Sequence, residues 1–313
     1  MSDHTYQCME VWGGNQPADN GVVMPGVDAW VCSRPYDNNE SGGDVHYVSS
    51  CATGRITRFL VADVAGHGST VSSVAITLRT LLRKYVNYID QGRLVRDLNN
   101  EFSGLSEAGI FATAVLATYF TPTRYLTLCN AGHPRPMHFD STKREWRVLT
   151  SREPLSPGAS NIPLGIAEGV AYDQLGVRLA PNDLVMLYTD ALVEAMNENG
   201  ELLGEAGLLR LLNSSGKTDL QPIVADILAG IEAFGGRPKD DVTILFLRPN
   251  GMSPRTTMLE RAGAIGRFLK LLVSRGKTTP IPWPELSLVN IFGALLRPVN
   301  RRWGGAKNQS RSA

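Results

Sequence analysis

The stretch at residues 59–86, FLVADVAGHGSTVSSVAITLRTLLRKYV, joins an apolar strand to a long helix through one aspartate and a glycine-flanked histidine. The apolar run ends at Asp63, and apolar residues then recur at helical spacing, which predicts a helix over about residues 67–89. Gly66 and Gly68 enclose His67 and begin a helix poorly, but glycine lets backbone approach a bound group closely. The junction therefore predicts that something binds beside the Asp63 carboxylate.

Apolar strand patterns recur on both sides of this stretch, separated by turn residues. We expect strands at 28–34, 44–51, 55–64, 111–120, 125–132, 135–140, 144–150, 183–190 and 241–248. Further helices are expected at about 93–106, 204–213 and 219–235. The rest of residues 1–43 is rich in Gly, Pro, Asn and Asp and is interpreted as irregular. Two runs of strands interrupted by helix pairs favour an α+β domain of packed sheets flanked by helices.

The composition limits the class of protein. The chain has 313 residues, 43% of them hydrophobic, which is enough for the core of one or two domains. A net charge of +1 gives no overall field to attract nucleic acid. The four cysteines form no C-x-x-C pair, and the first residues lack the basic and apolar regions of a signal peptide. We therefore expect free thiols in a reducing compartment and a cytoplasmic protein.

Four acidic positions stand at the ends of apolar strand patterns, namely Asp44, Asp63, Asp190 and the pair Asp240-Asp241. A carboxylate at the rim of a sheet is costly to desolvate unless it is paired or bound to a cation. Lys239 adjoins Asp240, and the other positions have no basic residue within several places. Oxygen ligands alone select hard cations such as Mg²⁺, Mn²⁺ or Ca²⁺. The four positions together predict a site for such ions.

Two ions about 4 Å apart could also bridge a hydroxide and clamp a phosphoryl group for in-line attack. The alternative interpretation is that each aspartate, taken alone, forms a turn or caps a helix. Asp63 fits that alternative least, because the Gly-His-Gly that follows it makes a poor helix start unless close approach matters. From these residues alone, the reaction stays open.

Seven blocks of sequence occur in one order, and together they resemble a known family. They are SGGDVHYVSS, VADVAGHGS, FATAVLATYF, NAGHPRPMHF, PLGI, DLVMLYTDALVEAMNENGELLG and DDVTILFLR, within about residues 42–248. The set is similar to the bacterial stage II sporulation protein E branch of the metal-dependent (PPM-type) protein serine/threonine phosphatases. The resemblance implies an α+β fold, a four-layer αββα sandwich of two antiparallel sheets flanked by helices.

The resemblance also implies two Mn²⁺ or Mg²⁺ ions and a water nucleophile. Asp63 resembles the catalytic acid that bridges both metals. The other implied metal ligands are Asp44, the carbonyl of Val64, Asp190 and Asp240, with Asp241 as the alternative to Asp240. Asp44 would act directly or through a bound water.

Three further positions bear on this implied site. His67 either donates a proton to the leaving serine oxygen or braces the metal-binding loop. Ala191 stands where the family usually has glycine, and if that glycine needs a positive φ, alanine would strain the turn by about 1 kcal/mol. Arg34 is the candidate for the phosphate-binding arginine of eukaryotic relatives.

The function that the resemblance implies is hydrolysis of phosphoserine or phosphothreonine on a regulatory protein in signal transduction. Substrates in the resembled branch are often small phosphorylated regulators, such as anti-sigma factor antagonists. The alternative is a module that keeps the fold, has lost turnover and acts as a binding or regulatory partner.

Residues 249–313 differ from the rest of the chain in charge. They hold 11 Lys and Arg against 2 Asp and Glu, whereas the preceding residues hold 20 against 28. Apolar and basic residues at helical spacing predict a C-terminal helical extension that contacts a membrane surface or packs on the body or a partner. We thus expect an entry segment at 1–41, a phosphatase-like domain at 42–248 and a basic amphipathic extension at 249–313.

Overall fold

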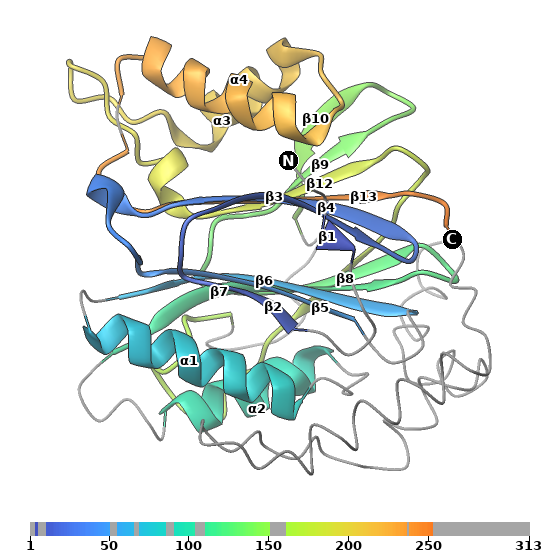
Figure 1. Ribbon diagram of the computed structural model, residues 1–313, viewed down its shortest axis with the longest axis vertical. Helices are drawn as coiled ribbons and strands as arrows, with labels where there is room; N and C mark the ends of the chain where they lie inside the picture. The colour runs from blue at the N-terminus through green and yellow to red at the C-terminus, as the bar shows by residue number, and fades with distance from the viewer. Residues whose placement is uncertain are drawn as a thin grey trace.

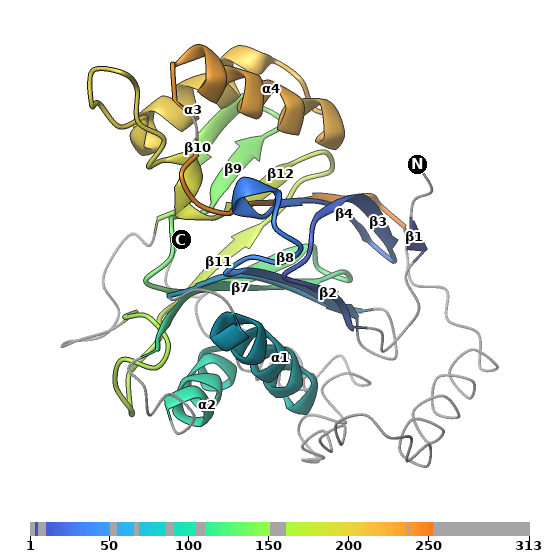
Figure 2. The same cartoon turned by 60° about the vertical axis from the view of Figure 1, so that its left-hand side comes forward.

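Two β-sheets lie face to face in the middle of the molecule, and a pair of helices covers the outer face of each sheet (Figure 1). This computed structural model describes residues 4–5, 11–50, 55–65, 69–85, 91–103, 110–150, 161–236 and 238–252. The same order of helices, sheet, sheet and helices is visible after a turn of 60° (Figure 2). The α+β, four-layer αββα fold implied by the resemblance is confirmed.

The first sheet, called sheet A, has seven strands in the spatial order β1-β3-β4-β13-β12-β9-β10. Neighbouring strands are antiparallel except β1 and β3, which run parallel. The strands are β1 (His4–Thr5), β3 (Ala18–Met24), β4 (Val27–Arg34), β9 (Met137–Asp140), β10 (Glu145–Val148), β12 (Leu184–Tyr188) and β13 (Val242–Pro249).

The second sheet, called sheet B, has six antiparallel strands in the order β11-β8-β7-β6-β5-β2. They are β2 (Val11–Gly14), β5 (Asp44–Ser50), β6 (Ile56–Val64), β7 (Ala112–Phe120), β8 (Tyr125–Ala131) and β11 (Gln174–Arg178). The central strand β6 is buried at almost every position, as expected for a strand that is covered on both faces.

Four α-helices complete the layers in the described part of the chain. On sheet B lie α1 (Ser69–Lys84) and α2 (Gln91–Ser103), and on sheet A lie α3 (Gly204–Ser215) and α4 (Leu220–Ala233). Two short 3₁₀ helices, η1 (Tyr36–Asn38) and η2 (Asp190–Leu192), follow β4 and β12.

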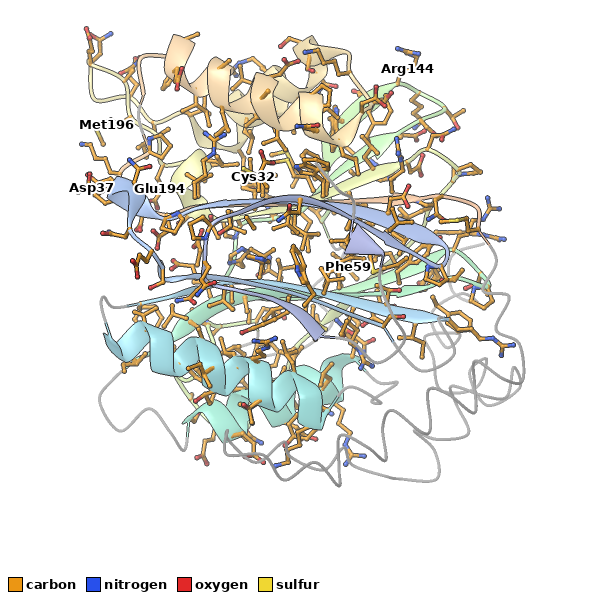
Figure 3. The ribbon with its side chains drawn as sticks, viewed as in Figure 1. Cys32, Asp37, Phe59, Arg144, Glu194 and Met196 are labelled. Atoms are coloured by element: carbon orange, nitrogen blue, oxygen red, sulfur yellow. The ribbon has the colours of Figure 1, made fainter. Side chains whose placement is uncertain are left out.

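Side chains that alternate along β6 serve two different cores. Leu60 and Val64 pack with the residues of α1 and α2, whereas Phe59 and Val61 lie in the core between the sheets (Figure 3). A third apolar core fills the space between sheet A and the helices α3 and α4. Asp63 shares its face of β6 with Phe59 and Val61, so its side chain belongs to the space between the two sheets.

Most expected strands and helices are found within a few residues of their predicted positions. The interpretation of residues 1–43 as irregular outside 28–34 was wrong, because β2 and β3 also form there. The turn from β3 to β4 contains Pro25 and Gly26, and Gly26 has a φ of 89°, as the third residue of a type II turn requires. Strand β11 was missed because its side chains are largely half-buried or exposed and leave no apolar pattern.

Several predictions concern residues outside the described ranges. These include His67, Cys8, Cys51 and the whole C-terminal extension beyond Met252. Cys32 and Cys129 are described and buried. None of the helices in the described part of the chain combines the length and apolar character needed to cross a bilayer.

The buried carboxylate of Asp183 joins β12 to β9 and provides a test of how the fold is stabilised. Its oxygens accept hydrogen bonds from His138 Nε2 (3.1 Å), the Ser141 hydroxyl (2.7 Å) and the Ala180 N–H (2.8 Å). Burial alone would raise the pKa of Asp183, but these hydrogen bonds outweigh it and hold the pKa at about 2. The ionised form is therefore favoured by folding.

We expect Asp183→Asn to lower the free energy of unfolding by about 1–3 kcal/mol near neutral pH. The asparagine NH₂ group would face N–H and O–H groups that now donate to the carboxylate, and these would lose their acceptor. The folded pKa lies below the unfolded value of about 3.9, so this contribution is present above pH 4 and is lost toward pH 2. Urea unfolding at pH 6, 4 and 2.5 should show the gap to wild type closing. Asp140→Asn, at the half-buried end of β9, keeps an oxygen for the Thr142 and Lys143 N–H groups and should change stability by less than about 0.5 kcal/mol. A gap that stays constant with pH would contradict this account.

Candidate metal centre

The strand ends that carry the predicted acids meet at one edge of the sandwich. Asp44 begins β5, Asp63 lies near the end of β6, and the two residues are directly opposite in the antiparallel register. In sheet A, Asp190 follows the end of β12, and the pair Asp240-Asp241 precedes the neighbouring strand β13. Both sheets thus contribute carboxylates to the same edge.

Asp63 is the most strongly influenced of these acids by its neighbours. Burial raises its pKa, and the charges of Asp190, Asp240, Asp241 and Glu194 raise it further, to about 7. These carboxylates come from three separate parts of the sequence, so only the fold brings them within electrostatic range. A cation among them would remove the repulsion.

Asp44 lies deeper than Asp63 and is almost completely buried. Burial raises the pKa of Asp44 well above its usual value, the Thr189 hydroxyl opposes this shift, and the charge of Asp63 adds to it. The Thr189 hydroxyl donates a hydrogen bond to Oδ2 of Asp44 at 2.8 Å. A residue that follows a strand of sheet A therefore binds the carboxylate of Asp44, which belongs to sheet B.

Asp240 and Asp241 have different surroundings. Oδ1 of Asp241 accepts a hydrogen bond from the Tyr36 N–H at 2.6 Å, and Oδ2 accepts one from the Gly43 N–H. Oδ1 of Asp240 accepts the Asp241 N–H at 2.8 Å, and its charge raises the pKa values of Asp63, Asp190 and Glu194. Both oxygens of Asp241 thus bind backbone N–H groups, whereas one oxygen of Asp240 does so and the Asp240 charge acts on three other acids.

Glu194 joins this group, although the sequence analysis did not select it. It lies at the edge of the molecule near Asp37 (Figure 3). Burial and the charges of Asp190 and Asp240 raise the pKa of Glu194. The backbone N–H of Glu194 donates to the Asp190 carbonyl at 2.8 Å, so one helical turn brings the two side chains to the same place. Its spacing of four residues from Asp190 is the signal in the sequence, but Glu194 itself stands at no strand end.

Gly43 lies close to three oxygens of this group. A Cβ atom at this position would lie 3.2 Å from the Val64 carbonyl oxygen and 3.5 Å from both Asp63 Oδ1 and Asp241 Oδ2. The Gly43 carbonyl in turn accepts the Val64 N–H at 3.3 Å. Three oxygens of different origin therefore face one small space that any larger residue would fill.

The donor set of this edge fits a hard divalent cation. It consists of carboxylate and carbonyl oxygens, which Mg²⁺ and Mn²⁺ prefer. Within the described ranges, no three Asp, Glu, His or Cys side chains lie close enough together to hold a metal ion as they stand. His67, the predicted proton donor or brace, lies outside the described residues.

The structure answers two questions that the sequence raised. Ala191 is buried in η2 and is not among the described non-glycine residues with positive φ, so the condition for strain after Asp190 is not met. Arg34 alternates with Ser33 along β4 and shares the outer face of sheet A with Cys32. Its side chain therefore starts on the face of β4 that points away from the acids.

The buried histidines near this edge are neutral. Burial lowers the pKa of His133 to about 3 and that of His46 to about 4. Nδ1 of His133 is 2.8 Å from the hydroxyl of Thr113, the residue opposite Asp63 on β7. Both histidines pack in the interior, and neither supplies positive charge to the acids.

Comparisons with known proteins identify the family and the fold. The family model described as Stage II sporulation protein E (SpoIIE) matches residues 53–250. The phosphoserine phosphatase RsbU of Bacillus subtilis (strain 168) is 24% identical over 212 residues, which cover 66% of this chain and 59% of RsbU. The chain thus matches less than two thirds of the length of that relative.

Solved structures share the fold. The RsbU and RsbW domains of Rv1364c from Mycobacterium tuberculosis superimpose with a TM-score of 0.61 at 22% identity, over 83% of this chain and 78% of that one. RsbX in complex with magnesium superimposes with a TM-score of 0.54 at 16% identity, over 74% of this chain and 100% of that one.

Gly43→Ala tests whether the space at Gly43 receives a metal ion. We expect the added methyl group to weaken Mn²⁺ binding at least about tenfold, because it would crowd the Val64 carbonyl and two carboxylates. Isothermal titration calorimetry measures this directly. Gly14→Ala, on strand β2 of the same sheet, places its Cβ in open space and should bind like wild type. Equal affinities for Gly43→Ala and wild type would show that no ion uses this space.

Proposed function

Because the chain belongs to the stage II sporulation protein E (SpoIIE) family of PPM-type phosphatases, we propose that it is a metal-dependent protein phosphatase. Its substrate would be phosphoserine or phosphothreonine on a regulatory protein. The match to a phosphoserine phosphatase supports this activity. That match covers 59% of the relative, so the activity of this chain is a proposal.

The observation that carries the proposal is the environment of Asp63. Among the described residues, the charged groups that act on its carboxyl are all acidic, and together with burial they raise its pKa to about 7. Repulsion within such a cluster destabilises a fold unless a cation neutralises it. Acids with perturbed pKa values of this kind gather at functional sites. A cation site explains the cluster, the oxygen-only donor set and the three oxygens close to Gly43 together.

We assign the proposed ligand roles from the surroundings of each acid. Asp63 would contact both ions, and Asp190, Asp240 and the Val64 carbonyl would complete the set. Asp241 would anchor the loop before β5, since both of its oxygens bind backbone N–H groups. Asp44 would act directly or through a water, with one oxygen already engaged by Thr189.

Two Mn²⁺ or Mg²⁺ ions, when bound, would supply the Lewis acidity and the lowered water pKa that let a hydroxide attack phosphorus in line. The crystal structure of RsbX, which shares the fold, contains magnesium, and this supports ions of this type. The chain's own acids would hold the site, and Glu194 would extend their field toward the surface at the edge marked in Figure 3. His67 would donate the proton to the departing serine oxygen or brace the loop.

A phosphorylated regulatory protein, such as an anti-sigma factor antagonist, is the substrate that the family resemblance suggests. The alternative function is a module that binds partners without turnover. Ala191 was the sequence feature in favour of that alternative, and its ordinary backbone conformation weakens the case. Turnover decides between the two functions.

Hydrolysis of p-nitrophenyl phosphate and of a phosphoserine protein should require Mn²⁺ or Mg²⁺ and stop with a chelator. We expect Asp63→Asn and Asp190→Asn to lower kcat at least about 100-fold, because each removes a charge that holds the ions. Asp140→Asn, at the half-buried end of β9 and far along the chain from these acids, should retain wild-type turnover. Activity without metal, or activity unaffected by Asp63→Asn, would defeat the proposal.

We also propose that the basic extension beyond residue 248 contacts an anionic membrane surface peripherally. Its excess of Lys and Arg and its apolar residues at helical spacing support this. The competing possibility is packing on the catalytic body or on a partner. The extension lies almost entirely outside the described residues, so the support comes from the sequence.

Sedimentation with anionic and neutral liposomes tests the extension. Full-length protein should pellet with anionic vesicles and dissociate in high salt, because the attraction is electrostatic. A truncation after Met252 should stay in the supernatant. This end point keeps β13 and Asn250, whose side chain bonds the Met24 carbonyl at 2.9 Å and Asp28 Oδ1 at 2.7 Å. Equal pelleting of both proteins would exclude the extension as the contact.

A further inference from the structure

Thr189 is a fully buried threonine that connects the two sheets directly beneath the candidate metal centre. It follows the last residue of β12 and immediately precedes Asp190. Its hydroxyl donates to Oδ2 of Asp44, at the start of β5 in the other sheet, at 2.8 Å. One side chain thus links the carboxylate of sheet B to the strand of sheet A that carries Asp190.

The direction of this hydrogen bond follows from the neighbours of the Thr189 hydroxyl. The oxygen accepts the backbone N–H of Thr243 at 2.9 Å, which occupies one of its lone pairs. A threonine hydroxyl has a single hydrogen to donate. Its alternative acceptor, the Thr243 carbonyl, is 3.5 Å away, so the shorter bond to Asp44 takes the hydrogen.

Thr243 ties the third acidic segment into the same unit. It lies two residues after Asp241 on β13, and its carbonyl accepts the Thr189 N–H at 3.1 Å. Its own hydroxyl is 3.0 Å from the hydroxyl of Ser33 on β4. The Thr189 side chain therefore stands where β5, β12 and β13, which carry or adjoin Asp44, Asp190 and Asp240-Asp241, come together.

The Thr189 hydrogen bond supplies a directional contact that the apolar core between the sheets lacks. The core between the sheets consists of residues such as Phe59, Val61 and Leu245, which pack closely but impose no particular orientation on a carboxylate. A hydrogen bond to a carboxyl oxygen is more directional than such packing. It fixes one Asp44 oxygen and commits that oxygen to the protein.

We propose that Thr189 is a positioning residue for the metal centre, acting through Asp44. Its hydroxyl holds the Asp44 carboxylate in one orientation against the strand end that bears Asp190. The role needs the hydroxyl and not merely the shape of the side chain. This inference rests on the proposed metal-dependent function, but it concerns ion binding, which can be measured without turnover.

Valine has nearly the shape of threonine without the hydroxyl, so Thr189→Val removes the hydrogen bond and keeps most of the packing. We expect its Mn²⁺ dissociation constant, measured by calorimetry, to rise about tenfold. We expect kcat for p-nitrophenyl phosphate to fall about tenfold at saturating Mn²⁺, with KM changed less than about threefold. Thr189→Ser keeps the hydroxyl and should restore both quantities to within about threefold of wild type.

Thr57→Val is the matched control for the valine substitution. Thr57 is a fully buried strand threonine near the opposite end of β6 from Asp63, and its hydroxyl has no hydrogen-bond partner in the described structure. Thr57→Val should bind Mn²⁺ like wild type. Circular dichroism melts of every variant separate loss of fold from loss of ion binding.

Three outcomes would overturn the inference. The first is Thr189→Val with wild-type Mn²⁺ affinity and turnover. The second is Thr189→Ser as defective as Thr189→Val, which would assign the effect to the methyl group and not the hydroxyl. The third is wild-type protein that takes up no Mn²⁺, which would remove the metal centre as well. Wild-type protein that binds Mn²⁺ but hydrolyses no phosphoester would defeat the proposed function alone.

Discussion

The pairing of Asp44 with Asp63 on neighbouring antiparallel strands is the constraint on which the rest of the structure depends. Residues opposite each other in such a pair have side chains on the same face, and like charges there are destabilising. Here both carboxylates point into the space between the sheets, where burial raises their pKa values further. The fold therefore concentrates negative charge at a place where water cannot easily screen it.

The remaining architecture makes this concentration tolerable and useful. Cores on both sides of sheet B and a continuous core between the sheets keep the backbone of β5 and β6 rigid. Backbone N–H groups satisfy the oxygens of Asp241, and the Thr189 hydroxyl binds Asp44. The charges of Asp63, Asp190, Asp240 and Glu194 still act on one another, and this is the group that a divalent ion would neutralise.

Much of the fold could be predicted from the sequence because its strands are strongly apolar. β6, β7, β12 and β13 are buried over nearly their whole length and give long apolar runs. β3 and β11 gave no such signal, since β3 begins with turn-forming residues and β11 lies at an exposed edge. The acids at the ends of apolar runs were visible for the same reason, whereas Glu194 stands in a turn and was missed.

The sequence by itself determined which strands are apolar, that acids stand at their ends, and which family the ordered motifs resemble. Those features are local, because they depend on the composition and order of neighbouring residues. Only the tertiary structure decided that Asp241 binds the Tyr36 and Gly43 backbone while Asp240 faces the other acids. It also decided that Thr189 reaches Asp44, 145 residues earlier in the chain. Strand pairing and sheet packing set these distances, and a local pattern carries no information about which distant residues they bring together.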